Sequence, residues 1–144
     1  MNRIKVNRVV LAGIVTLLVF ILLEIIVEYV IGRALFGSMI DEWYLEAFSI
    51  SKWSVANHVL NLFIAWVTCA TLAWLYAALR PMFGVGTKTA LIASAFTLFF
   101  FATFSFNFVN LGIIPLKIVL IDLGYNLIEL PIAITVGARI YEGE

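Results

Sequence analysis

The sequence predicts an all-α fold, a polytopic bundle of four transmembrane helices with a short interfacial segment between the first two. Hydrophobic residues make up 64% of the 144 residues, and charged residues make up only 12%. Soluble domains carry about 25% charged residues. The mean hydropathy is +1.10, and the apolar residues form four long runs. Because a bilayer core requires about 20 apolar residues per helix, four crossings would use most of this chain.

Each run is interpreted as one helix of a single membrane domain. The helices are expected at about 9–31, 54–79, 89–111 and 118–138, within a domain that spans residues 1–144. The first run follows a basic start and is longer than the apolar part of a typical signal peptide, which favours a retained helix. Pro81, Gly84 and Gly86 are typical of a tight connection between the second and third helices. Pro115 suits the first turn of the fourth helix.

The connection between the first two helices mixes acidic and aromatic residues from Ser38 to Phe48. This composition indicates an amphipathic helix at the membrane surface, with Trp43, Tyr44 and Trp53 at headgroup level. A simple ordered loop is the alternative.

Basic residues predict the orientation. If the N-terminus is cytoplasmic, six basic residues lie on that side: Arg3, Lys5, Arg8, Arg80, Lys88 and Arg139. Three lie on the other side: Arg33, Lys52 and Lys117. Cytoplasmic loops carry an excess of Lys and Arg, so both termini are expected in the cytoplasm, in a bacterial inner membrane.

Polar residues inside the apolar runs are the candidate site. Asp122, Asn126 and Glu129 fall within about a 60° arc of one helical face. Under the predicted topology, the polar groups of all four helices lie in the outer half of the bilayer. The candidate ligand-binding residues are Glu24, Glu28, His58, Asn61, Asn107, Asp122, Asn126 and Glu129. Acids exposed to lipid are costly, so these groups are expected to face a shared polar pocket or cleft.

Two interpretations of this set remain open. The acids and amides could bond across helices and hold the bundle together, with the acids protonated by burial. Alternatively, they could bind a proton, a cation or a small polar ligand. No metal site is predicted, because the chain has neither an HExxH motif nor a second histidine. The single cysteine, Cys69, is interpreted as a small packing residue.

His58 has two interpretations of its own. A lone histidine in the first turn of a membrane helix is expected to be a hydrogen-bonded interface residue. A neutral imidazole can also be an axial ligand of a haem or a pigment, and Phe63 and Trp66 would suit a flat ring system. No cofactor is predicted, and haem or pigment at His58 stays the alternative. A nucleophile–base arrangement is not apparent in the sequence, so an enzyme is not expected.

Both ends of the chain resemble a group of small bacterial integral membrane proteins of four helices with no assigned function. The similar segments are Asn7 to Gly13 at the start, Leu127 to Pro131, and Gly137 to Tyr141. The resemblance covers the two terminal helices, and it draws attention to Glu129 without implying any chemistry.

The function expected is that of a small non-enzymatic membrane protein, an accessory or structural subunit or a homo-oligomer. Its partners would be the lipid bilayer and either a second copy or a larger membrane complex. Nucleic acid is not an expected partner, because the formal net charge is zero. The alternative is binding or transport of a proton, cation or small polar ligand through the outer pocket of acids and amides.

Overall fold

The computed structural model describes residues 4–27, 30, 33–36 and 54–143, and within these ranges the protein is helical with no strand. The helices are α1 (Val6–Ile26), α2 (Arg33–Phe36), α4 (Val55–Phe83), α5 (Thr87–Asn110) and α6 (Leu116–Glu142). The predicted all-α class with four long helices is therefore confirmed. Glu28, the interfacial segment expected from Ser38 to Phe48, and Trp53 lie outside the described residues.

The four long helices are those that could cross a bilayer. Each of α1, α4, α5 and α6 contains a stretch that is long and apolar enough for a span. Large apolar side chains remain exposed along all of them. Such a surface is stable only where lipid or another protein covers it, so the chain is a membrane protein.

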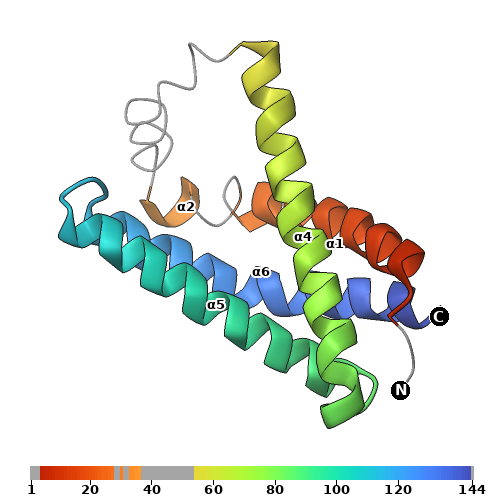
Figure 1. Cartoon of the computed structure of the whole chain (residues 1–144). Helices are drawn as coiled ribbons and strands as arrows, with labels where there is room; N and C mark the ends of the chain where they lie inside the picture. The colour runs from red at the N-terminus through yellow and green to blue at the C-terminus, as the bar shows by residue number, and fades with distance from the viewer. Residues whose placement is uncertain (1–3, 28–29, 31–32, 37–53, 144) are drawn as a thin grey trace.

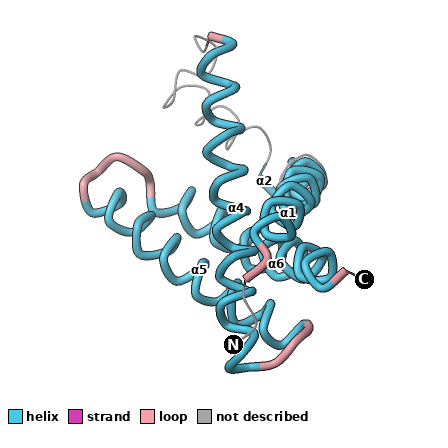
Figure 2. Tube along the Cα trace, turned by 45° about the vertical axis from the view of Figure 1, so that its right-hand side comes forward, coloured by secondary structure: helices cyan, strands magenta, loops and turns pink. Residues whose placement is uncertain are grey.

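Helix α6 lies in the middle of the arrangement and packs against α1 on one side and α5 on the other (Figure 1). Helix α4 crosses these helices steeply and contacts α1 and α5 through its second half (Figures 1 and 2). The first half of α4 extends away from the other long helices, and every side chain from Ser54 to Ile64 is exposed. The described ends of the chain, near Ile4 and Gly143, lie at the same end of the structure.

Small residues allow the helices to approach closely where they cross. A Cβ on Gly13 would come within 2.6 Å of the Ala70 Cα, so α1 and α4 meet there almost backbone to backbone. A Cβ on Gly137 would overlap Thr16 Oγ1, which brings α6 onto α1. Small residues are common at such contacts in membrane proteins. Lipid supplies no hydrophobic driving force between apolar helices, so their association depends on close van der Waals packing.

Many buried side chains between the helices are also small. The core contains Ala12, Ala73, Ala77, Ala90, Ala93 and Ala138, with the larger Leu72, Tyr76, Leu130, Ile134 and Tyr141 between them. Cys69 is buried as well, in the packing role that its position predicts.

Local sequence fixes the ends of α4. Ser54 precedes the helix, its hydroxyl accepts a hydrogen bond from the Asn57 backbone, and the Asn57 side chain accepts one from the Ser54 backbone. This reciprocal cap satisfies two backbone donors at the helix start. The helix continues through Pro81 to Phe83, four residues beyond the predicted end. Proline near the helix end removes only one backbone hydrogen bond, and the chain turns instead at Gly84 and Gly86, which have φ angles of 88° and 105°.

Candidate functional site

Part of the predicted acid and amide cluster forms along one face of α6. Asp122 is partly buried, Asn126 is buried, and the Glu129 side chain is 3% exposed. The Asn126 amide donates to the Asp122 carbonyl at 2.9 Å and to the Asp122 carboxylate at 3.3 Å. The 60° arc expected from the sequence therefore places these groups on the inner side of the helix.

Helix α1 adds Glu24 to this cluster. The chain directions of α1 and α6 are opposite, since Arg8 meets the end of α6 and Thr16 meets Gly137. Continuing this antiparallel pairing for eight residues brings Glu24 level with Glu129. The carboxyl groups of Glu24 and Asp122 are also close enough for their like charges to repel each other. We call Glu24, Asp122, Asn126 and Glu129 the acid–amide cluster.

Three predicted site residues do not lie in this cluster. His58 and Asn61 are exposed on the first half of α4, which stands away from α1 and α6. Asn107 is exposed near the end of α5. Within the described residues, no group of three or more His, Cys, Asp and Glu side chains is arranged to hold a metal ion.

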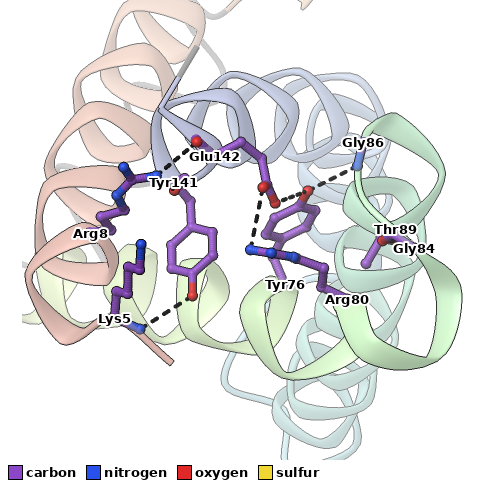
Figure 3. Close-up of polar contacts among 9 residues, drawn as sticks. All are labelled: Lys5, Arg8, Tyr76, Arg80, Gly84, Gly86, Thr89, Tyr141 and Glu142. Atoms are coloured by element: carbon purple, nitrogen blue, oxygen red, sulfur yellow. Dashed lines mark hydrogen bonds and ion pairs between the residues drawn. The ribbon is translucent and has the colours of Figure 1, made fainter. Parts of the chain in front are cut away.

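A second polar site lies where the two described chain ends meet, about 24 Å along α1 from Glu24. Its members come from three helices and form what we call the terminal network (Figure 3): Arg8, Tyr76, Arg80, Tyr141 and Glu142. Tyr76 is fully buried at the centre of this region. Its hydroxyl donates to Glu142 Oε1 at 3.0 Å and accepts the Gly86 backbone N–H at 3.0 Å.

Arg80 completes the environment of Glu142. Its guanidinium lies 3.3 Å from Glu142 Oε2, so the two carboxylate oxygens have different partners. A carboxylate at the C-terminus of a helix is opposed by the helix dipole. The Arg80 cation and the Tyr76 donor offset that cost and tie α4, the α4–α5 turn and α6 together.

Arg8 binds the C-terminus of α6 directly. Its Nη1 donates to the Tyr141 carbonyl at 3.0 Å and to the Glu142 carbonyl at 2.7 Å. The last carbonyls of a helix have no partner within the helix, and a cation beside them is also favoured by the helix dipole. Arg8 therefore caps a helix that begins more than 100 residues after it, and both of these hydrogen bonds are to neutral carbonyls.

Aromatic rings fill the space between these charges. The Tyr76 and Tyr141 rings meet edge to face with centroids 6.1 Å apart, and the Arg80 guanidinium lies 5.8 Å from the Tyr141 centroid. The Tyr141 hydroxyl accepts the backbone N–H of Lys5 at 3.4 Å. These contacts hold the Tyr141 ring between the start of α1 and the end of α4 (Figure 3).

Two cavities flank the terminal network. The larger, about 560 Å³, is lined by Lys5, Arg8, Arg80, Tyr141 and Glu142, with Ile4, Ala77 and Pro81 as its apolar part. The smaller, about 220 Å³, lies on the other side of Glu142 and is bordered by Tyr76, Gly86, Thr135 and Arg139. The larger volume is within the range of ligand sites, about 300–1,000 Å³.

Sequence reasoning missed the terminal network because it placed the polar chemistry at the opposite end. Two signals could have found it. Tyr76 and Arg80 lie one turn apart on α4, so they share a face. Tyr141 and Glu142 lie at the end of the last apolar run, on the same predicted side as Arg8.

Comparison of the chain with protein-family models, with curated proteins and with solved structures found no match, so the conclusions below depend on its own geometry.

Proposed function

We propose that this protein is a non-enzymatic membrane component that acts by assembly, as an accessory or structural subunit or as a homo-oligomer. The supporting observation is the first half of α4, where all side chains from Ser54 to Ile64 are exposed in a helix of 29 residues. None of these side chains is buried among the other described helices. This half-helix is therefore available to a second copy or another subunit.

The chemistry of that half-helix supports a protein neighbour. Leu60, Leu62, Phe63 and Ile64 are each more than half exposed and form an apolar surface around Asn61. An amide among apolar side chains gains from a hydrogen bond across a helix interface, a common adhesive of membrane helices. We expect Asn61 to lie at such an interface.

Cysteine cross-linking in native membranes tests this proposal. In a Cys69→Ala background, Asn61→Cys should give a cross-linked dimer or a cross-link to another membrane protein. Phe99→Cys is the matched control, because Phe99 is 67% exposed on α5. Native mass spectrometry and an absorption spectrum of the gently extracted protein identify the partner and any pigment. A bare monomer that does not cross-link at residue 61 contradicts the proposal.

A second candidate function is binding of a proton, a cation or a small polar ligand at the acid–amide cluster. The like charges of Glu24 and Asp122 favour it, because a bound proton or cation would relieve their repulsion, and Glu129 is buried on the same face as Asn126. Glu129→Gln should then abolish proton or ligand coupling in reconstituted vesicles with little change in expression. If the cluster only joins helices, the same substitution changes thermal stability or assembly and nothing else.

The proposed location is a bacterial inner membrane with both termini in the cytoplasm. Lys5, Arg8, Arg80, Lys88 and Arg139 belong to chain segments at the end where the described termini meet, and Lys117 belongs to the α5–α6 end. This asymmetry agrees with the rule that cytoplasmic ends of membrane helices carry more Lys and Arg. A reporter that is active only in the cytoplasm should give a signal when it is fused after α6. A signal from a reporter that is active only outside the cytoplasm would contradict the assignment.

A further inference from the structure

The larger cavity beside the terminal network carries an excess of positive charge. Among the described residues, three cations line it, Lys5, Arg8 and Arg80, and the carboxylate of Glu142 is the one anion. Arg80 pairs with Glu142. Arg8 binds neutral backbone carbonyls, and Lys5 contacts Tyr141 through its backbone nitrogen, so neither side-chain charge is neutralised by these contacts.

The three cations lie around the Tyr141 ring. Lys5 and Arg8 lie within one turn at the start of α1, on the same flank of the Tyr141 ring in Figure 3, and Arg80 lies on the other flank. The hydrogen bonds of Arg8 to the end of α6 fix its guanidinium at the cavity wall. A fixed guanidinium with an adjacent ammonium is suited to the oxygens of a phosphate group.

We propose that this cavity binds the phosphate of an anionic headgroup, with a membrane glycerophospholipid as its source. The cavity lies at the ends of membrane helices, where headgroups lie, and basic pockets between such helices bind anionic lipids. Ile4, Ala77 and Pro81 form the apolar part of the cavity lining, and the neighbouring Val6 and Met82 are 68% and 76% exposed, so acyl chains would find apolar surface there. A free phosphate offers the same oxygens but no acyl chain to cover this surface.

The test compares lipids on the whole purified protein by native mass spectrometry. Dioleoyl-phosphatidylglycerol, which is anionic, should bind more tightly than zwitterionic dioleoyl-phosphatidylcholine. Lys5→Gln should lower the affinity for phosphatidylglycerol about fivefold, the effect of one basic residue near a membrane surface. Lys88→Gln is the matched control, because Lys88 is exposed at the start of α5 and does not line the cavity.

A second substitution separates binding from folding. Arg8→Gln removes the cap of α6 along with the charge and could fail to assemble. Arg8→Lys keeps the charge, so it should retain phosphatidylglycerol binding better than Arg8→Gln when both are compared at equal folded protein. Lys5→Gln keeps the backbone contact to Tyr141 and should leave the melting temperature of the lipid-free protein unchanged.

The results of these measurements distinguish a lipid headgroup from a free phosphate as the bound group. Preference for phosphatidylglycerol that is lost in Lys5→Gln but kept in Lys88→Gln supports the lipid headgroup. Stabilisation by inorganic phosphate alone, again dependent on Lys5, supports the phosphate site but assigns it to a soluble ligand. Equal binding of both lipids without any effect of phosphate overturns the proposal, as does an equal loss in the two lysine variants. None of these readouts depends on the cross-linking at residue 61. Failure of the lipid proposal would therefore leave the assembly proposal untouched, and the reverse also holds.

Discussion

In the second half of α4, Cys69, Leu72, Ala73, Tyr76 and Ala77 are buried, whereas in the first half every side chain from Ser54 to Ile64 is exposed. Both halves belong to one continuous helix with apolar composition. Backbone hydrogen bonds and the Ser54 cap are sufficient for the helix itself. What the second half adds is small residues at the crossing and polar partners at the terminal network, and these determine where α4 is held.

The largest effect is expected at the crossing of α1 and α4. Gly13→Ala places a Cβ 2.6 Å from the Ala70 Cα, so the backbones must separate, at a cost of about 1–3 kcal/mol. Gly124→Ala is the control, because nothing lies within 4 Å of its added Cβ. Thermal unfolding in mild detergent should show a lower midpoint for Gly13→Ala only. Equal midpoints would mean that the close approach does not hold α4.

Substitution of one leucine in each half of α4 compares how much each half contributes to the free energy of unfolding. Leu72 is 5% exposed and Leu62 is 56% exposed. Leu72→Ala should cost on the order of 2 kcal/mol through the cavity that it leaves. Leu62→Ala should change the free energy of unfolding of the isolated chain by less than about 0.5 kcal/mol. A large cost for Leu62→Ala would show that the first half is also packed within the monomer.

The hydroxyl of Tyr76 tests the polar contribution of the second half. Tyr76→Phe removes the donor to Glu142 and leaves the Gly86 N–H without its acceptor, so we expect a loss of about 1–2 kcal/mol. Tyr141→Phe removes one long bond of 3.4 Å and should cost less. The two melting midpoints are compared under the same detergent conditions. The reverse order would contradict the central position of Tyr76 in the terminal network.

The smallest global effect is expected at the cap of the exposed half. Ser54→Ala removes the hydroxyl that accepts the Asn57 N–H. Local helix stability should fall by about 1 kcal/mol, while the global midpoint stays unchanged because no buried contact depends on this turn. Hydrogen exchange should therefore accelerate only in the first turn of α4. A drop in the global midpoint would mean that the two halves unfold as one unit.

Composition and run length were enough to predict four apolar helices, because lipid requires long apolar stretches whatever the packing. The face that each helix turns to its neighbours was not predictable in this way. In a membrane protein the lipid-facing and the core-facing sides are both apolar, so Leu62 and Leu72 look alike in the sequence. Only the small residues at Gly13, Ala70 and Gly137 carry a signal for close approach, and it does not specify the partner helix.

For the candidate site, too, positions within one helix were predictable and contacts between helices were not. Spacing within one helix placed Asp122, Asn126 and Glu129 on a common face, and the antiparallel pairing of α1 with α6 adds Glu24. His58 and Asn61 were expected beside them because their depth in the membrane was similar. Depth does not determine lateral position, and the steep crossing of α4 carries both residues away from α1 and α6.

The cap that Arg8 provides for α6 also bears on the order of biosynthesis. Its bond to the Glu142 carbonyl joins residues 134 positions apart. At about 5–20 residues per second, α1 leaves the ribosome on the order of ten seconds before its partner exists. Helix α6, which lies between α1 and α5, is synthesised after both of them, so the earlier helices must wait in the bilayer without their central neighbour. During that interval Arg8 and the faces that α6 will cover are open to insertion factors and to lipid.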